Sequence, residues 1–307
     1  MNLLVGATGF IGGHVVEYLF QQGEISKGIF RKGSHLKIMD SNGVQGIEAD
    51  LLDHHALHEA MDGVDVVYSM ASPMPGSDSD FLKANTQGLL NLLEVATESK
   101  VKVFVQLSTL DVYGFGSKNV NPSSPLIPSA EYQKSKAEAE RLLREFSRRN
   151  PEPRISILRP ARAVGSRDET LAIPILRMIE SGKVTVPSEG RMSFSHPQDI
   201  AQALYRAATG KLNTGSTFLV KSFDSTPEEL VKGMAASLGK VVEVRRQGLF
   251  SSSALPKYVS EQLKASLRIE EQPSWAELGY VPKYDLKGTC EEISAWYRRE
   301  PWVTEDA

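Results

Sequence analysis

A tyrosine and a lysine four residues apart, Tyr132 and Lys136, offer the most direct chemistry in this sequence. They lie in a segment with a helical pattern, 130–149, and residues four apart share one face of a helix. An ammonium group beside a phenol stabilises the phenolate and lowers its pKa from about 10. The pair therefore predicts a proton donor or acceptor near neutral pH, although such a pair alone is usually a solvated helix face.

Two hydroxyl residues, Ser108 and Thr109, stand at the end of an apolar run that predicts a strand over 101–108. In open α/β sheets, ligands bind beyond the carboxyl ends of the strands. Both hydroxyls are therefore expected to point into a cleft. There Thr109 would orient a carbonyl or an alcohol against Tyr132.

A glycine-rich loop follows an apolar strand expected over 2–5 and precedes a helix expected over 12–22. The loop reads Gly6-Ala7-Thr8-Gly9-Phe10-Ile11-Gly12. Gly6 permits a tight turn, Gly9 lets the backbone approach a pyrophosphate, and Gly12 lets the helix pack closely on the strand. The helix N-terminus offers free N–H groups to the anion. Because a strand precedes the loop and a helix follows it, a dinucleotide site is favoured over a turn without a ligand.

The elements that must position these residues alternate through the first half of the chain. Strands are expected over 2–5, 28–31, 44–48, 64–70, 101–108 and 154–159, and helices over 12–22, 54–61, 80–98 and 130–149. This alternation predicts an α/β fold of the Rossmann type, with a doubly wound parallel sheet. After residue 160 helices dominate, over 170–181, 197–209, 226–238, 256–266 and 286–299.

Two lobes follow from this change of pattern. We expect a dinucleotide-binding Rossmann domain over 1–160, with returning segments near 192–222. A smaller, mostly helical C-terminal lobe over 161–191 and 223–307 would bind the substrate, a small molecule.

Composition and charge exclude several classes of protein. The 307 residues carry a net charge of −3, so electrostatics predict no nucleic-acid and no membrane partner. No apolar run approaches the roughly 20 residues of a membrane span, and the first residues already read as a core strand, which leaves no room for a signal peptide. A single cysteine, Cys290, excludes an internal disulfide and favours a reducing, cytoplasmic compartment. His54, His55 and His58 lack other ligands at metal spacing, so an exposed turn and helix start is favoured over a metal site.

Several motifs together resemble one family along nearly the whole chain. They are the loop over 6–12, Ser108-Thr109-Leu110-Asp111-Val112-Tyr113-Gly114, Tyr132 with Lys136, Leu158-Arg159-Pro160, Phe194-Ser195-His196-Pro197-Gln198-Asp199-Ile200-Ala201 and Leu278-Gly279-Tyr280-Val281-Pro282. They resemble an extended short-chain dehydrogenase/reductase, the group that includes NAD-dependent epimerases and dehydratases and dihydroflavonol-reductase-like enzymes.

This resemblance implies roles for individual residues. Tyr132 would exchange a proton with a substrate oxygen while hydride moves to or from nicotinamide, and Lys136 would also bind the nicotinamide ribose. Thr109 would be the catalytic hydroxyl, with Ser108 in reserve. The remaining assignments are Pro160 on the nicotinamide, Asp50 and Leu51 near the adenine, Ala71 and Ser72 beside the pyrophosphate, Asp199 as a helix cap and Asn85 as an architectural residue. Asp50 fits a turn equally well.

The second strand carries the signal for the choice of cofactor. NAD-binding folds usually place a carboxylate after this strand, but no acidic residue occurs between Glu24 and Asp40. Arg31 and Lys32 instead offer two cations where the 2′-phosphate of NADP would sit. NADP is therefore favoured and NAD is the alternative, unless Arg31 is only a solvated charge at the strand end.

The substrate is less well specified. Nucleotide-sugar enzymes of this family often carry an asparagine and an arginine at two positions where this chain has Arg162 and Met192. The dehydratases among them carry an aspartate directly after the catalytic threonine, where this chain has Leu110. We therefore favour an NADP-linked reductase or dehydrogenase acting on a carbonyl or secondary alcohol. A nucleotide-sugar epimerase or dehydratase is the alternative, and a dinucleotide-binding sensor without catalysis is the second. An apolar pocket lined by Pro73, Met74, Pro75 and Phe115 would suit the first hypothesis.

The resemblance also implies a homodimer, formed through the helices over 80–98 and 130–149. A cluster of leucines could serve that interface or face the sheet instead. Its members are Leu89, Leu90, Leu92 and Leu93.

Overall fold

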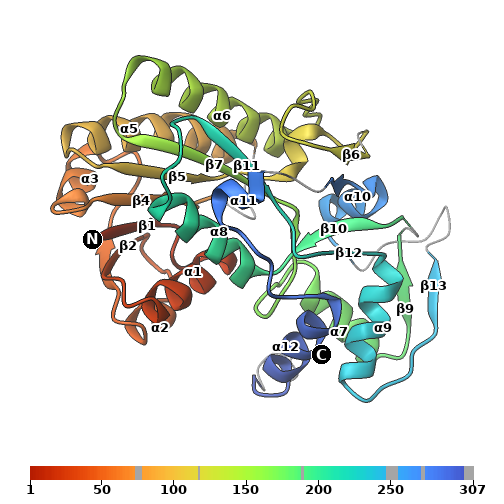
Figure 1. The fold of residues 1–307 in the computed structure, drawn as a ribbon. Helices are drawn as coiled ribbons and strands as arrows, with labels where there is room; N and C mark the ends of the chain where they lie inside the picture. Colours follow the sequence, from red (N-terminus) through yellow and green to blue (C-terminus); the bar gives the residue numbers. More distant parts are fainter. Residues whose placement is uncertain (73–77, 117, 188–189, 247–254, 271–273, 301–307) are drawn as a thin grey trace.

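A parallel sheet forms the centre of the larger lobe (Figure 1). The computed structural model describes the chain except residues 73–77, 117, 188–189, 247–254, 271–273 and 301–307. Within the described residues the sheet has seven strands, in the order β11-β7-β5-β4-β1-β2-β3, and every neighbouring pair is parallel. The bounds are β1 Asn2–Val5, β2 Ser26–Phe30, β3 Gln45–Glu48, β4 Val66–Ser69, β5 Val103–Leu107, β7 Arg154–Pro160 and β11 Ser216–Val220. The predicted doubly wound Rossmann-type sheet is confirmed.

Helices cover both faces of this sheet, which is why its strands are apolar on both sides. In β1, Leu3 and Val5 pack into the core beneath one set of helices, and Leu4 packs into the core beneath the other. The first set is α3 His54–Met61, α5 Leu89–Glu98 and α6 Glu131–Arg149, and the second is α1 Phe10–Gln21, α2 Lys37–Asp40 and α8 Pro197–Thr209. Within the described parts of the chain, no helix is both long and apolar enough to span a bilayer.

A short π-helical stretch interrupts the helical region between β4 and β5. It covers Ala84–Gly88 and joins α4, Asp78–Lys83, to α5. Leu89, Leu92 and Leu93 are buried in the core under the sheet, whereas Leu90 is half-buried. Three of the four leucines proposed for a dimer interface therefore face the sheet, and the homodimer stays a prediction.

The smaller lobe has a separate hydrophobic core, to which α7, α9 and α12 contribute buried residues. Its helices are α7 Ala172–Glu180, α9 Pro227–Ser237, α10 Lys257–Ala265, α11 Ser274–Leu278 and α12 Leu286–Tyr297. In the part of the chain that the structure describes, short strands add three small sheets that the helical pattern did not predict. They are β8 Arg162–Ala163 with β10 Met192–Ser195 and β12 Phe223–Ser225, β9 Val184–Val186 with β13 Val244–Arg246, and β6 Asn119–Val120 with β14 Arg268–Ile269. Cys290 is buried in this core, and burial raises the pKa of its thiol to about 12.

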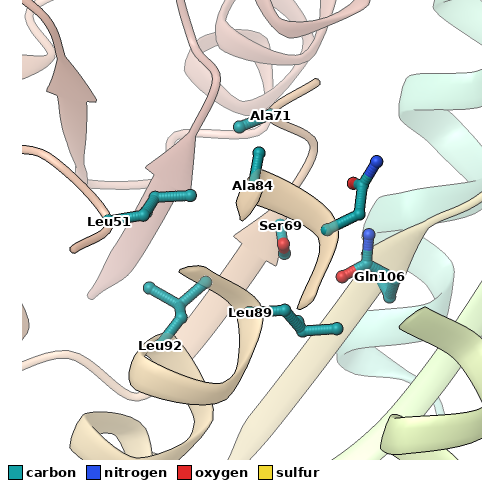
Figure 2. A pocket seen from close by; sticks show the side chains of 8 residues that line it. Leu51, Ser69, Ala71, Ala84, Leu89, Leu92 and Gln106 are labelled. Atoms are coloured by element: carbon teal, nitrogen blue, oxygen red, sulfur yellow. The ribbon is translucent and has the colours of Figure 1, made fainter. Parts of the chain in front are cut away.

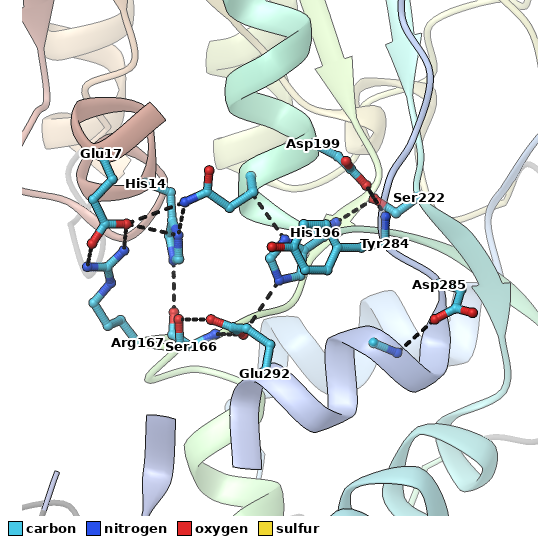
Figure 3. Close-up of polar contacts among 12 residues, drawn as sticks. His14, Glu17, Ser166, Arg167, His196, Asp199, Ser222, Tyr284, Asp285 and Glu292 are labelled. Atoms are coloured by element: carbon cyan, nitrogen blue, oxygen red, sulfur yellow. Dashed lines mark hydrogen bonds and ion pairs between the residues drawn. The ribbon is translucent and has the colours of Figure 1, made fainter. Parts of the chain in front are cut away.

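Buried polar side chains join the two lobes (Figure 3). His14, on α1, places Nε2 3.1 Å from the carbonyl oxygen of Ser166. Glu292, on α12, accepts hydrogen bonds from the amide and the hydroxyl of Ser166, at 3.1 and 2.5 Å. His196 stacks on Tyr284 with ring centroids 3.6 Å apart. The helix that follows the glycine-rich loop is thereby linked to the C-terminal helix.

Burial, followed by the charge of Arg167, lowers the pKa of His14 to about 4. Between pH 4 and 6.5 the unfolded chain therefore binds more protons at this position than the folded chain. The free energy of unfolding should fall as the pH drops through this window, by roughly 3 kcal/mol at most from this group.

Replacing His14 with Gln should remove this contribution, so that urea unfolding between pH 4.5 and 7.5 depends less on pH than in the wild type. His55→Gln is the control, because His55 is exposed on α3. Equal slopes for His14→Gln and wild type would contradict the assignment.

Candidate active site

The loop between β1 and α1 has two glycines that the fold itself requires. Gly6 adopts a φ of +94°, and a Cβ there would lie 2.7 Å from the backbone nitrogen of Ala71. A Cβ on Gly12 would lie 1.9 Å from the carbonyl oxygen of Gly6. These two residues allow the tight turn and the close approach of α1 that the sequence predicted.

Gly9 differs, because neither conformation nor packing within the chain demands a glycine. Its φ is −81°, and the nearest atom to a Cβ built there is 3.5 Å away. Gly9 is exposed and forms the N-cap of α1 without a side-chain hydrogen bond, so the first N–H groups of the helix are left for an anion. The neighbouring Thr8, Phe10 and Ile11 are half-buried. The loop therefore fits the phosphates of a dinucleotide.

A cavity lies beside this loop at the carboxyl end of β4 (Figure 2). Its lining residues are Leu51, Ser69, Ala71, Ala84, Asn85, Leu89, Leu92 and Gln106. Within the described residues, Ser72 Oγ and Gln106 Oε1 are buried without a hydrogen-bond partner, which is rare for polar atoms in folded proteins. Such atoms fit a site that a polar ligand completes.

Three other residues predicted to contact the cofactor, Asp50, Arg31 and Lys32, lie around the same edge of the sheet. Asp50 is exposed and accepts a hydrogen bond from the amide of Leu52 at 2.8 Å, the turn role that the sequence left open. Arg31 and Lys32 follow β2 and are exposed.

Asn85 is buried in the π-helical stretch and donates to Ser135 Oγ on α6 at 3.1 Å.

The first turn of α6 carries Tyr132. The helix begins there because Gln133 reaches back, and its Oε1 accepts hydrogen bonds from the amides of Ser129 and Ala130, at 2.8 and 3.2 Å. The Tyr132 ring contacts Phe81 and Tyr258 edge-on, with centroids 5.5 and 5.6 Å apart.

One turn further along α6, Lys136 is only 2% exposed. Its Nζ lies 3.4 Å from the carbonyl oxygen of Leu107, the last residue of β5. The fold therefore brings the Tyr132–Lys136 face of α6 to the strand end that precedes Thr109.

The pKa of Tyr132 is raised, not lowered as the sequence predicted. Burial is the largest cause and the charge of Asp111 is the second. Burial also lowers the pKa of Lys136 to about 8. The prediction was wrong because it considered the neighbouring cation and not the loss of solvent.

The two strand-end hydroxyls do not share one cleft. Ser108 is buried, and its Oγ donates to Glu140 Oε1 at 2.6 Å. Glu140 also forms a buried ion pair with Arg159, in which Arg159 Nε donates at 2.8 Å. Thr109 is half-buried, and its Oγ1 accepts a hydrogen bond from the amide of Asp111 at 3.2 Å. The expectation for Ser108 was therefore wrong, and Thr109 is the more accessible hydroxyl.

The smaller lobe contributes residues to this region that the sequence did not single out. Tyr258 and Gln262, one turn apart on α10, both donate to Asp111 Oδ2, at 2.8 and 2.5 Å. Tyr258 also contacts the ring of Phe115, with centroids 5.5 Å apart. Burial raises the pKa of the Asp111 carboxyl.

One further expectation needs revision, that Asp199 caps α8. His196, not Asp199, caps α8, because its side chain accepts a hydrogen bond from the amide of Gln198 at 3.2 Å. The Asp199 carboxylate instead accepts from the hydroxyl of Ser222 and the amide of Lys283, at 2.6 and 2.9 Å.

Of the other residues considered for substrate binding, Arg162 has partners within the chain, and three lie outside the described residues. Arg162 is engaged by Asp168 and Thr170, with Nη2 3.2 Å from the nearer carboxylate oxygen and 2.6 Å from the hydroxyl. Pro73, Met74 and Pro75, proposed to line an apolar pocket, lie outside the described residues.

Known proteins share both this sequence pattern and this fold. The N-acetyl-alpha-D-glucosaminyl-diphospho-ditrans,octacis-undecaprenol 4-epimerase of Escherichia coli O157:H7 is 30% identical over 192 residues, which cover 61% of this chain and 56% of that protein. The chain thus spans about half the length of that relative. Sterol demethylase protein B of Methylococcus capsulatus is 28% identical over 340 residues, covering 98% of this chain and 99% of that protein.

The UDP-glucuronic acid 4-epimerase from Bacillus cereus, solved in complex with NAD, has the same fold. It superposes with a TM-score of 0.80 at 20% identity, over 97% of this chain and 99% of that one. The family model for the NAD dependent epimerase/dehydratase family matches residues 2–220, which include the glycine-rich loop, Thr109 and the Tyr132–Lys136 pair. The chain belongs to the NAD dependent epimerase/dehydratase family and is an enzyme of the extended short-chain dehydrogenase/reductase type.

Proposed function

We propose that this enzyme interconverts a secondary alcohol and its ketone, with Tyr132 as the acid and base. The observation that carries the proposal is the placement of a half-buried phenol and a buried ammonium group, Lys136, on one helix face at the end of β5. Thr109, at the same strand end, would orient the substrate oxygen.

The cofactor would lie across the loop over 6–12 and the cavity at the end of β4. Gly9 and the N-terminus of α1 would hold the pyrophosphate, Ser72 and Gln106 would supply polar contacts, and Lys136 would bind the nicotinamide ribose. Bound nicotinamide supplies or accepts the hydride. The comparisons support NAD, and Arg31 and Lys32 would favour NADP only if the enzyme is the simple reductase considered below as the second candidate.

The raised pKa of Tyr132 has a consequence for its role. At neutral pH the phenol is protonated, so it is ready to donate a proton to a carbonyl oxygen as the oxygen gains negative charge. In the reverse direction the same oxygen takes the proton from the alcohol. Lys136, whose pKa is about 8, is mostly charged at pH 7 and would stabilise the phenolate formed on donation.

For the substrate, the comparisons support the nucleotide-sugar alternative better than the simple reductase. We therefore propose first a 4-epimerase acting on a diphosphate-linked sugar, the class named for the Escherichia coli and Bacillus cereus relatives. Such an enzyme oxidises and re-reduces one carbon, so it keeps its NAD and shows no net redox change.

A simple dehydrogenase or reductase is the second candidate. It is favoured by the aromatic rings of Phe81 and Tyr258 around Tyr132, and by the engagement of Arg162 with Asp168. The relative that matches over 98% of the chain is a sterol demethylase protein, whose name also fits an apolar substrate.

One experiment separates the two candidates. Purified protein is assayed for bound NAD, for interconversion of UDP-glucose and UDP-galactose, and for oxidation of NADH or NADPH with cyclic ketones. Stoichiometric NAD with sugar interconversion supports the epimerase, and net oxidation of added cofactor supports the reductase. If the protein neither binds a cofactor, nor interconverts the sugars, nor oxidises added NADH or NADPH, both candidate functions are contradicted.

Replacing Tyr132 with Phe should reduce turnover about 10²- to 10⁴-fold, because the proton donor is lost while the ring and its packing remain. Cofactor binding, followed by fluorescence titration, should be unchanged. Tyr205→Phe on α8 is the matched control. Full activity of Tyr132→Phe would exclude this residue as the proton carrier.

Replacing Arg31 with Asp should weaken NADPH binding about tenfold relative to NADH, a difference of about 1.4 kcal/mol. The carboxylate would repel the 2′-phosphate and accept hydrogen bonds from the ribose hydroxyls of NAD. Lys37→Asp, the same charge change at the exposed first residue of α2, is the control. An unchanged ratio of the two affinities would remove Arg31 from the site.

A further inference from the structure

We propose that His54, His58 and Glu98 form a surface site for a divalent transition-metal ion such as Zn²⁺. The site lies at the junction of α3 and α5, on the helical layer that covers one face of the sheet. It uses no residue of the proposed acid–base machinery.

The three side chains converge from two helices. His54 begins α3 and His58 lies one turn later, so both rings occupy one helix face, with centroids 5.1 Å apart. Glu98 ends α5, and its Oε2 lies 2.7 Å from His58 Nε2. One ligand atom from each residue lies within 4.8 Å of the other two.

This separation is close to that of a metal centre. Bonds of about 2.0–2.2 Å from zinc to nitrogen and oxygen place the donors of a tetrahedral site roughly 3.4 Å apart. To bind the ion, the two ligand atoms that are farthest apart would have to move closer, and the distance between His58 Nε2 and Glu98 Oε2 would have to increase slightly. Because His54 and Glu98 are exposed, side-chain rotation can make both adjustments without moving the backbone.

The donor set selects the class of metal. Two imidazole nitrogens and one carboxylate oxygen suit Zn²⁺, Ni²⁺ or Cu²⁺, whereas Mg²⁺ and Ca²⁺ prefer oxygen ligands throughout. A pair of histidines four residues apart on a helix is also the spacing of known helical zinc sites. Three protein ligands leave one position of a tetrahedral ion for water.

Neighbouring side chains of α3 are engaged elsewhere, which distinguishes this cluster from a general concentration of charge. The Asp53 carboxylate caps the helix by accepting a hydrogen bond from the amide of Ala56 at 3.1 Å. His55, between the two proposed ligands, faces Glu59, with Nε2 and Oε1 3.5 Å apart. The sequence predicted no metal here because Glu98 is 40 residues away from His58 and joins it only in the folded chain.

An ion at this position would cross-link the start of α3 to the end of α5. Asn91, also on α5, donates to the carbonyl oxygen of Leu51 at 3.0 Å, so the segment before α3 is already tied to the same helix. Leu51, Leu89 and Leu92 line the cavity of Figure 2. The metal would therefore hold together two elements that form one wall of the proposed cofactor site.

The test is calorimetric titration of the full chain, freed of any affinity tag and treated with a chelator, with ZnCl₂. We expect one ion per chain, and binding at least tenfold weaker in His58→Ala and Glu98→Gln. His55→Ala is the matched control and should bind like the wild type. ZnCl₂ should raise the melting temperature of wild type and of the control, and MgCl₂ should leave it unchanged.

His54→Gln provides a second variant at an exposed position, in case His58→Ala disturbs the fold, which circular dichroism would detect. Binding of zinc that is equal in wild type, His54→Gln and Glu98→Gln would overturn the proposal, as would an equal loss in His55→Ala. Absence of zinc binding by the folded wild type would overturn it directly.

Discussion

A buried ion pair between Glu140 and Arg159 determines where Tyr132, the proposed acid–base residue, lies. Glu140 is on the same face of α6 as Tyr132 and Lys136, and its carboxylate and the Arg159 guanidinium are 1% and 2% exposed. Removing one partner would leave an uncompensated buried charge, at a cost of about 3–5 kcal/mol. Because Arg159 lies on β7, the pair fixes the rotation of α6 against the sheet. Any other rotation would turn Tyr132 away from the end of β5.

The same burial explains the electrostatics of the site. Loss of solvent disfavours the phenolate of Tyr132 and the ammonium form of Lys136, so the pKa of the phenol rises, the pKa of the ammonium group falls, and the two values move apart. Asp111 adds to the effect on Tyr132, and Arg162 opposes it. A tyrosine in this environment is a proton donor at neutral pH.

Local patterns predicted the sheet and most helices because each strand and helix has its own periodicity, and α8 begins at Pro197 and ends at Thr209 as expected. The error at Ser108 was avoidable, since successive side chains of a strand point to opposite faces and Ser108 and Thr109 cannot share one. Tyr258 gave no local signal. Its contact with Asp111 joins residues 147 positions apart, and only the packing of α10 on the larger lobe creates it.

The two lobes are coupled at both ends of the site, and this constrains the substrate. Near the cofactor loop, His14 and Glu292 meet at Ser166; near the acid–base residue, α10 donates two hydrogen bonds to the buried Asp111. A substrate that separated Tyr258 from Tyr132 would leave the Asp111 carboxyl without these partners, at about 1–3 kcal/mol for each unsatisfied group. Substrates that reach Tyr132 with α10 in place avoid this cost. For the proposed reaction, the space between α6 and α10 would therefore contribute to substrate selection.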